Sequence, residues 1–232
     1  MGAESLQVAA DQSRELTIER VQREVMGLMA DAPEGDGLDE LTAALIGLAA
    51  RSCGTTLDID GTREHLALVL DAGGTGEQIA EMMVMISGIG IHGLIGTAGV
   101  VAEVLRERGH PAMDEQFTPH QQAVWDRVGG GDAREARIAA ISPEFLPNLV
   151  RLVPEPMLRA VLDFRAAPWC SDTMTPLQME LIGIAVDTMP SHRFLPTLRM
   201  HVNRAKQFGA GQRMIRETLA ISAAAPPHRG VW

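Results

Sequence analysis

Histidines are the side chains of this sequence best suited to proton transfer, because imidazole is the group that titrates near neutral pH. His65 and His201 lie 136 residues apart, and each is followed 27 residues later by another histidine, His92 or His228. In a pocket, such an imidazole could donate a proton to a carbon atom or remove one. We expect the other three histidines to lie near turns at the surface: His110, His120 and His192.

The residues around His201 favour an acid-binding site. If residues 195–208 form a helix, Thr197 and Arg204 share a face with His201, four residues before it and three after it. Arg204 is then the nearest candidate to bind an anion, while Arg199 projects to another side of the helix and is a second substrate-binding candidate. Glu180 precedes this helix and could orient the imidazole or raise its pKa through its negative charge.

The surroundings of His65 are less polar, so its unit resembles a degenerate copy, although His65 remains a catalytic candidate. His92 and His228 are further substrate-binding candidates. Two histidines with Glu81 or Glu217 would match a metal site in ligand type, but no HxxxH or HxH spacing is present. We therefore expect neither a metal nor another cofactor. Each matched histidine also has a structural alternative, as a buried group that bridges helices.

The composition excludes several classes of protein. The chain has 232 residues, of which 46% are hydrophobic, and its net charge of −10 includes no basic block, which disfavours nucleic-acid binding. Tyrosine is absent and Lys206 is the single lysine, so little is available for phenolic acid or Schiff-base catalysis. Cys53 and Cys170 form no CxxC pair. With no secretory signal at the N-terminus, we expect a cytoplasmic protein.

Apolar residues recur at spacings of three and four, which predicts an all-α fold. Residues 82–102 contain no Asp, Glu, Lys or Arg and are long enough to span a bilayer. Because polar helices flank this segment, we expect a core helix of a protein that does not enter the membrane. The predicted helices are 16–29, 38–52, 62–72, one long helix from Thr75 to about Arg108, two short helices within 142–164, and further helices from Thr175 onward.

Shifting the sequence by 136 positions reveals an internal repeat. Residues 38–96 and 174–232 align without gaps and share 11 identities in 59 positions, including Leu45-Ile46-Gly47 on Leu181-Ile182-Gly183. Such spacing predicts duplication of a helical unit. The predicted organisation is an N-terminal helical extension (1–37), repeat one (38–112), a linker with short helices (113–173) that includes the Gly-rich segment 128–133, and repeat two (174–232).

Repeat two resembles the carboxymuconolactone decarboxylase family, which belongs to the alkylhydroperoxidase D-like superfamily. Repeat one matches more weakly, and Ala44 stands where repeat two has Glu180. Together the two blocks cover about 120 residues. The residues that carry the resemblance are Thr175, Pro176, Glu180, His201, Ala205, Gly209, Ile215 and Glu217 in repeat two, and His65, Gly73, Ile79 and Glu81 in repeat one.

The resemblance implies an alkylhydroperoxidase D-like helical fold and a homo-oligomer. Peroxidase members carry a Cys-x-x-Cys pair before the histidine, but here those places hold Phe194 and Thr197, or Asp58 and Gly61 in repeat one. Without a thiolate at these positions, disulfide-relay peroxidase chemistry is disfavoured. The decarboxylase branch, which lacks the pair, fits better.

These observations lead to one main hypothesis and two alternatives. The main one is a cofactor-independent enzyme of decarboxylase or lactone-isomerising type, acting on a small organic acid or lactone with His201 as proton donor or base. One alternative is an enzyme of the same fold that modifies a larger apolar metabolite. Met82, Met83 and Met85 could then line an adaptable pocket for this substrate. The other is a non-catalytic duplicated scaffold or ligand-binding protein.

Overall fold

The computed structural model describes residues 16–114, 116–128 and 144–228, which form helices joined by turns and loops. No strand occurs in these ranges, which confirms the predicted all-α class. The helices are α2 (Ile18–Leu28), α3 (Glu40–Ser52), α4 (Ile59–Asp71), α5 (Gly76–Ser87), α6 (Gly90–Glu107), α7 (Pro119–Val128), α9 (Phe145–Leu152), α10 (Glu155–Ala166), α11 (Pro176–Thr188), α12 (Leu195–Gln207) and α13 (Gln212–Ala223), with short 3₁₀ turns η1 (Pro111–Met113) and η2 (Ala167–Cys170).

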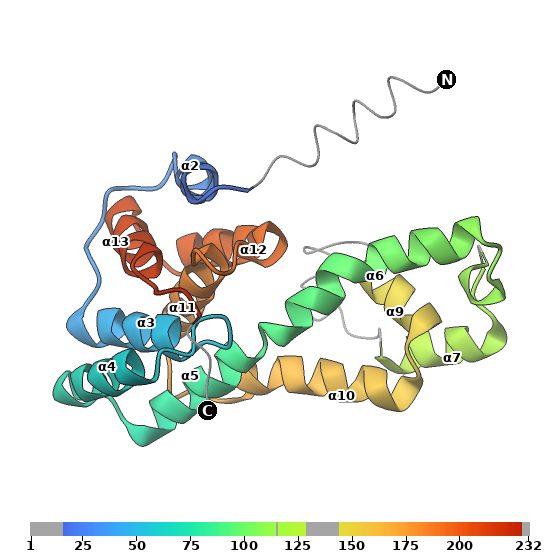
Figure 1. Ribbon diagram of the computed structural model, residues 1–232, viewed down its shortest axis with the longest axis horizontal. Helices are drawn as coiled ribbons and strands as arrows, with labels where there is room; N and C mark the ends of the chain where they lie inside the picture. The colour runs from blue at the N-terminus through green and yellow to red at the C-terminus, as the bar shows by residue number, and fades with distance from the viewer. Residues whose placement is uncertain (1–15, 115, 129–143, 229–232) are drawn as a thin grey trace.

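The helices form two parts, a body and an arm (Figure 1). The body consists of α2, α3, α4, α5, α11, α12 and α13, which enclose the larger hydrophobic core. The arm consists of α6, α7, α9 and α10 and has a separate small core, built around Phe145, Leu149 and Leu158. Because each part buries its own apolar side chains, the arm extends from the body as a packed unit rather than as a loose loop.

Helix α11 lies at the centre of the body. Every residue from Gln178 to Thr188 is buried, and the helix contacts α2, α3, α5, α12 and α13. Thr175 and Gln178 form a capping box at its start. Pro176 occupies the first turn, where a backbone N–H would have no partner within the helix, so the absence of this group from proline costs nothing. Such all-round burial explains the long apolar run in this part of the sequence.

Three helices of the body recur with the same lengths and at the same offset. Helices α3, α4 and α5 span 13, 13 and 12 residues, as do α11, α12 and α13, and each pair starts 136 residues apart. Gln178 donates a hydrogen bond to Thr42 at 3.1 Å, and Ser191 donates one to Thr55 at 3.2 Å, again with an offset of 136. Contacts between equivalent residues are expected along a two-fold axis. This geometry supports the proposal of a duplicated unit.

The long apolar helix predicted from Thr75 to Arg108 is interrupted. Helix α5 ends at Ser87 and α6 begins at Gly90, and at the junction the Gly88 N–H bonds the Met85 carbonyl, a tighter turn than that of an α-helix. A Ser-Gly-Ile-Gly sequence is a common place for a helix to kink, because glycine constrains the backbone weakly. The kink aims α6 away from the body and into the arm (Figure 1).

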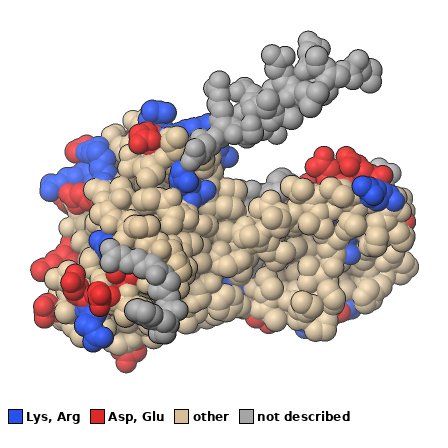
Figure 2. All heavy atoms as spheres, viewed as in Figure 1, with Lys and Arg blue, Asp and Glu red and all other residues tan. Residues whose placement is uncertain are grey.

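The prediction that residues 82–102 lie in a core is wrong for the single chain. Large apolar side chains on this stretch are exposed, Met83 by 54% and Val100 by 59%. Within the described residues, Gly76–Glu107 is the one helical stretch long and apolar enough to cross a membrane, and 11% of its most apolar window is buried. Figure 2 shows a broad uncharged surface across the middle of the visible face, between charged groups over the body and at the far end of the arm.

The predicted linker regions correspond to the arm and to residues that are not described. Segment 113–173 contains α7, α9, α10 and η2, so most of its described residues are helical and pack in the arm. The Gly-rich segment 128–133 lies outside the described residues except for Val128. In the predicted N-terminal extension, α2 packs on α12 and α13.

The homo-oligomer expected from the family resemblance remains a prediction, and we expect a second copy to cover the exposed apolar face of α6. Replacing the exposed Val100 and Val104 by Lys should convert an oligomer to a monomer, because the interface would have to bury two lysine charges that are stable in water. Sedimentation velocity measures this change. Leu70→Lys, an equally exposed site on α4, is the control. A wild-type monomer that floats with lipid vesicles would instead assign this face to a membrane.

Candidate functional site

A small cavity of about 100 Å³ lies where the α5–α6 kink faces α10, α11 and α12. This volume is sufficient for several water molecules or for a small organic molecule. Most of its wall is apolar, with Ile86, Ile95 and Phe164 among the residues that form it. The polar and charged residues of the wall are His92, Arg165, Asp187, Thr197 and His201.

A buried acid holds His201 in the cavity wall. The Glu180 side chain is fully buried on α11, and its Oε2 lies 2.6 Å from His201 Nδ1 on α12. Arg204, one turn further along α12, donates from Nε to the other carboxylate oxygen, and its guanidinium lies 5.1 Å from the Trp169 ring centre. Since Glu180 occupies Nδ1, Nε2 is the ring nitrogen available to a molecule in the cavity.

Gly183 allows this imidazole to approach α11. A Cβ atom at Gly183 would lie 2.7 Å from both Cε1 and Nδ1 of His201, too close for any side chain. The equivalent glycine of the first unit, Gly47, has the same relation to His65, where a Cβ would lie 2.4 Å from Cδ2. In both units the imidazole therefore packs directly against the backbone of the neighbouring helix.

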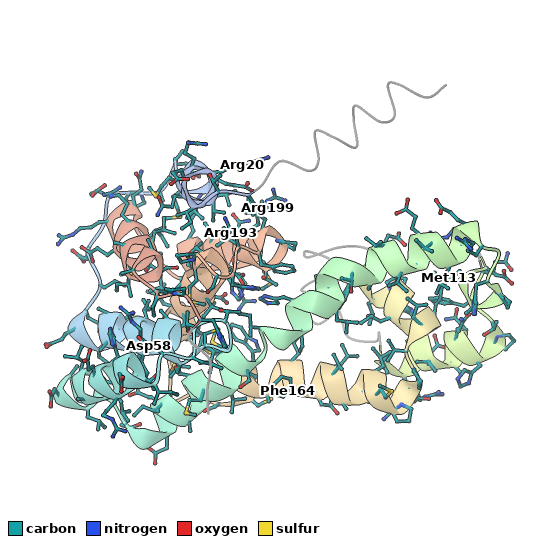
Figure 3. All side chains as sticks on the ribbon, in the orientation of Figure 1. Arg20, Asp58, Met113, Phe164, Arg193 and Arg199 are labelled. Carbon is teal, nitrogen blue, oxygen red and sulfur yellow. The ribbon has the colours of Figure 1, made fainter. Side chains whose placement is uncertain are left out.

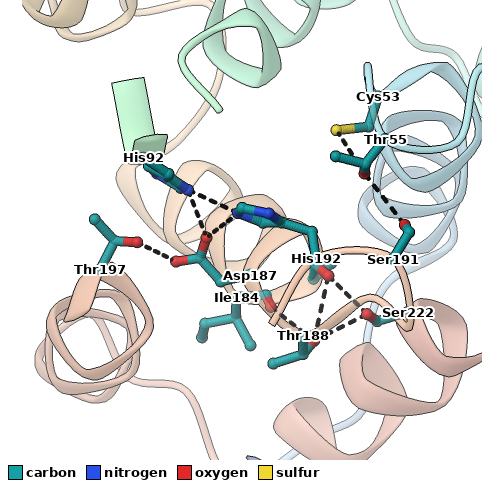
Figure 4. A network of polar contacts seen from close by, with 11 residues as sticks. Cys53, Thr55, His92, Ile184, Asp187, Thr188, Ser191, His192, Thr197 and Ser222 are labelled. Atoms are coloured by element: carbon teal, nitrogen blue, oxygen red, sulfur yellow. Dashed lines mark hydrogen bonds and ion pairs between the residues drawn. The ribbon is translucent and has the colours of Figure 1, made fainter. Parts of the chain in front are cut away.

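A second polar cluster forms another part of the wall (Figure 4). Asp187, in the last turn of α11, is 1% exposed and accepts a 2.6 Å hydrogen bond from the Thr197 hydroxyl at Oδ2. Its Oδ1 lies 3.5 Å from His92 Nδ1 and 3.7 Å from His192 Nε2. The two imidazole nitrogens are 2.8 Å apart, and Phe194 stacks on His92. The start of α6, which is distant in sequence, thus meets the end of α11 and the α11–α12 loop here.

Burial changes the protonation of this cluster. Burial lowers the pKa of His92 to about 3, and electrostatic repulsion from the neighbouring imidazoles and from Arg165 acts in the same direction. Burial also lowers the pKa of His192 to about 4. Conversely, burial raises the pKa of Asp187 to about 7, although His201 and the Thr197 hydroxyl oppose this. At neutral pH both imidazoles are therefore uncharged.

The structure brings together four of the eight predicted site residues around or beside the cavity. His201, Thr197 and His92 contribute to its wall, and Glu180 lies directly behind His201. The residue predicted to bind an anion, Arg204, is engaged by Glu180 and does not contribute to the wall. Their catalytic and substrate-binding roles remain predictions.

The other predicted site residues lie elsewhere. His65 packs in the first unit, where its Nδ1 is 2.9 Å from the Gly61 carbonyl oxygen, one helical turn away. Arg199 points toward α2 and pairs with Glu24 (Figure 3). His228 is exposed beyond the end of α13 and lies outside a helix, whereas His92 lies in α6.

Glu81 and Glu217, the two acids weighed above as possible metal ligands, form hydrogen bonds with other groups. Glu81 binds the Thr173 hydroxyl and the Met174 N–H, and Glu217 accepts from the Leu38 N–H at 2.7 Å. Neither acid contributes to the cavity wall or belongs to the cluster that His92 forms, so the ligand set considered in the sequence is not assembled among the described residues.

Sequence reasoning missed three residues of the site: Asp187, His192 and Arg165. Asp187 lies seven residues after Glu180, a spacing that returns to the same helix face and could have indicated it. His110 and His120 are exposed as expected, but the same expectation for His192 is wrong, since its side chain is 17% exposed. Arg165 comes from the arm, whose packing against the body no local pattern predicts.

The cysteines give no support to a thiol mechanism. Both are free; Cys53 is buried and Cys170 is exposed. Burial raises the pKa of the Cys53 thiol, so the reactive thiolate is disfavoured. Neither residue belongs to the cavity wall.

Comparisons with known proteins identify the fold. No family model matches the sequence, and no curated protein matches it. Among solved structures, the chain is similar to a protein from Burkholderia xenovorans described provisionally as a gamma-carboxymuconolactone decarboxylase subunit. The TM-score is 0.64 at 25% sequence identity, over 89% of this chain and 90% of that one. The chain thus has the helical fold of the carboxymuconolactone decarboxylase and alkylhydroperoxidase D-like proteins, which confirms the resemblance seen in repeat two.

Replacing Gly183 by Ala should displace His201. We expect a loss of about 1–3 kcal/mol in the free energy of unfolding, because the added methyl overlaps a buried, hydrogen-bonded ring. Denaturant unfolding measures this loss, and NMR of the imidazole protons reports the displacement. Gly27→Ala, in a helical position with open space around it, is the control and should be neutral or stabilising. A Gly183→Ala variant as stable as wild type, with an unshifted His201 signal, would contradict the close packing.

Proposed function

We propose that this protein is an enzyme that transfers a proton to or from a carbon atom of a small organic acid or lactone. The observation that carries the proposal is the Glu180–His201 pair, whose imidazole forms part of the wall of a mostly apolar cavity. Decarboxylation or lactone isomerisation is the reaction class we favour, in line with the description of the similar solved structure.

The proposed roles follow from the positions of the side chains. Glu180 holds Nδ1 of His201, so Nε2 acts as the proton donor or base. Arg165 is the cation in the cavity wall and is suited to bind a substrate carboxylate, the role that sequence reasoning gave to Arg204. The apolar wall suits the carbon skeleton and keeps the polar contacts strong by limiting water.

A decarboxylation at this site would balance without a redox partner. The bond between the carboxylate carbon and its neighbour breaks, and the electron pair moves onto a conjugated carbonyl to give an enolate. Carbon dioxide leaves, and His201 then supplies a proton to carbon. In lactone isomerisation the same imidazole removes a proton from one carbon and returns it to another. Both reactions need one proton-transferring group close to carbon, and this is the role that we propose for His201.

His201→Gln should lower turnover by about 10²–10⁴-fold, the usual contribution of a general acid or base. A panel of small unsaturated acids and lactones, assayed for released carbon dioxide and for isomerised product, supplies the measurement. His120→Gln replaces an exposed histidine far along the arm and should leave turnover unchanged. Circular dichroism checks that both variants fold.

Two outcomes would contradict the proposal. Undiminished turnover by His201→Gln would remove this residue from the mechanism. Binding of panel members at the cavity without any product would instead favour the ligand-binding alternative.

A further inference from the structure

Three ligand-type atoms, one from α6, one from the end of α11 and one from the loop that follows α11, lie around a common centre. They are His92 Nδ1, His192 Nε2 and Asp187 Oδ1, and all three lie within 4.8 Å of one another (Figure 4). We propose that His92, Asp187 and His192 form a binding site for one divalent first-row transition metal ion, such as zinc or iron(II).

The spacing of the three atoms suits such an ion. The nitrogens are 2.8 Å apart, and Oδ1 lies 3.5 Å and 3.7 Å from them. A point equidistant from three atoms at these separations lies about 2.0 Å from each, which matches zinc–nitrogen and zinc–oxygen bonds. An ion close to this point would therefore lie at bonding distance from all three atoms.

The carboxylate oxygen that faces this point lacks a hydrogen bond. Asp187 Oδ1 is buried, and among the described residues it has no hydrogen-bond partner. Its other oxygen accepts from Thr197, which fixes the carboxylate plane and leaves Oδ1 directed at the histidines. A buried carboxylate oxygen is seldom left without a partner, and a cation would satisfy it.

The donor set favours transition metals over magnesium or calcium. Two imidazole nitrogens with one carboxylate oxygen are the ligands of many zinc and non-haem iron(II) sites, whereas Mg²⁺ and Ca²⁺ prefer oxygen alone. Supporting contacts are also present: Thr197 holds Asp187, and Phe194 stacks on His92 at a centroid distance of 4.4 Å. The three ligands leave further coordination positions open.

The three residues lie between two open spaces. His92 and Asp187 belong to the wall of the small cavity, which also contains His201. His92 and His192 border a wider, open hollow of about 820 Å³ next to Thr55 and Gly90, through which an ion could reach the site. If the proposed function holds, an ion here would bind an oxygen of the same substrate; this role rests on that function, whereas metal binding itself does not.

Metal binding can be tested without any substrate. Untagged protein, stripped with a chelator, is titrated with Co²⁺, whose visible spectrum reports coordination. We expect one equivalent to bind, Zn²⁺ to displace it because zinc binds such sites more tightly, and the melting temperature to rise with bound ion. The absence of a spectral change at tenfold excess Co²⁺ would overturn the proposal.

Variants assign the ion to these ligands. Asp187→Asn and His192→Gln should each weaken Co²⁺ binding at least tenfold, and His120→Gln, on the arm, should not. Because Asp187 is buried, His192→Gln, in a loop, serves if the first variant does not fold. Equal affinity in wild type and His192→Gln would overturn the assignment.

His201→Gln separates the two proposals. It should lose turnover but keep Co²⁺ binding within about twofold, since His201 is not one of the three ligands. Loss of turnover in His201→Gln with no metal bound by wild type would leave the proposed function intact and reject the metal site. Metal binding with turnover unaffected by His201→Gln would do the reverse.

Discussion

The burial of one carboxylate in the middle of α11 constrains the rest of the site. A fully buried charge is costly unless charged or hydrogen-bonding partners surround it, and Glu180 has both His201 and Arg204. These two partners lie three residues apart on α12, so the pairing fixes which face of α12 meets α11. Gly183, one turn further, then allows the ring to lie against the helix. The position of the cavity wall follows from this arrangement.

The first unit shows what happens to the histidine when the acid is absent. Ala44 stands where Glu180 stands in the second unit, and His65 instead lies within hydrogen-bonding distance of the Gly61 carbonyl of its own helix. The glycine against the ring is retained, as Gly47. The close packing of the ring on a glycine is therefore common to both units, while the buried acid that holds the imidazole through Nδ1 occurs in the second unit. Duplication of the unit, as proposed, would account for both observations.

Local pattern predicted the helices well and the site in part. The apolar spacing located α3, α4 and the start of α11 to within a few residues, because periodicity and capping residues are encoded locally. His201 and Glu180 were also recognised, since helix geometry and the family resemblance both indicate them. The kink at Gly88 was not predicted, because glycines recur along the whole segment and are equally compatible with a closely packed continuous helix.

The remaining parts of the site depend on tertiary contacts that no short pattern contains. His92 meets His192 only because the kinked α6 leaves the body beside the α11–α12 loop. Arg165 reaches the cavity through the packing of the arm. The exposed apolar surface of α6 misled the interpretation for a related reason: apolar composition shows that a segment avoids water, but it does not show what covers it.

The two sides of the cavity belong to parts of the fold that are buried to different degrees. Glu180 and Asp187 lie on α11, which is enclosed by other helices, so its amides should exchange with solvent only when the body opens as a whole. His92 lies in the first turn of α6, just past the kink, where the helix is largely exposed. Opening at the junction would therefore carry His92 away while the acids stay in place, and the contacts of this histidine couple the arm to the centre of the body.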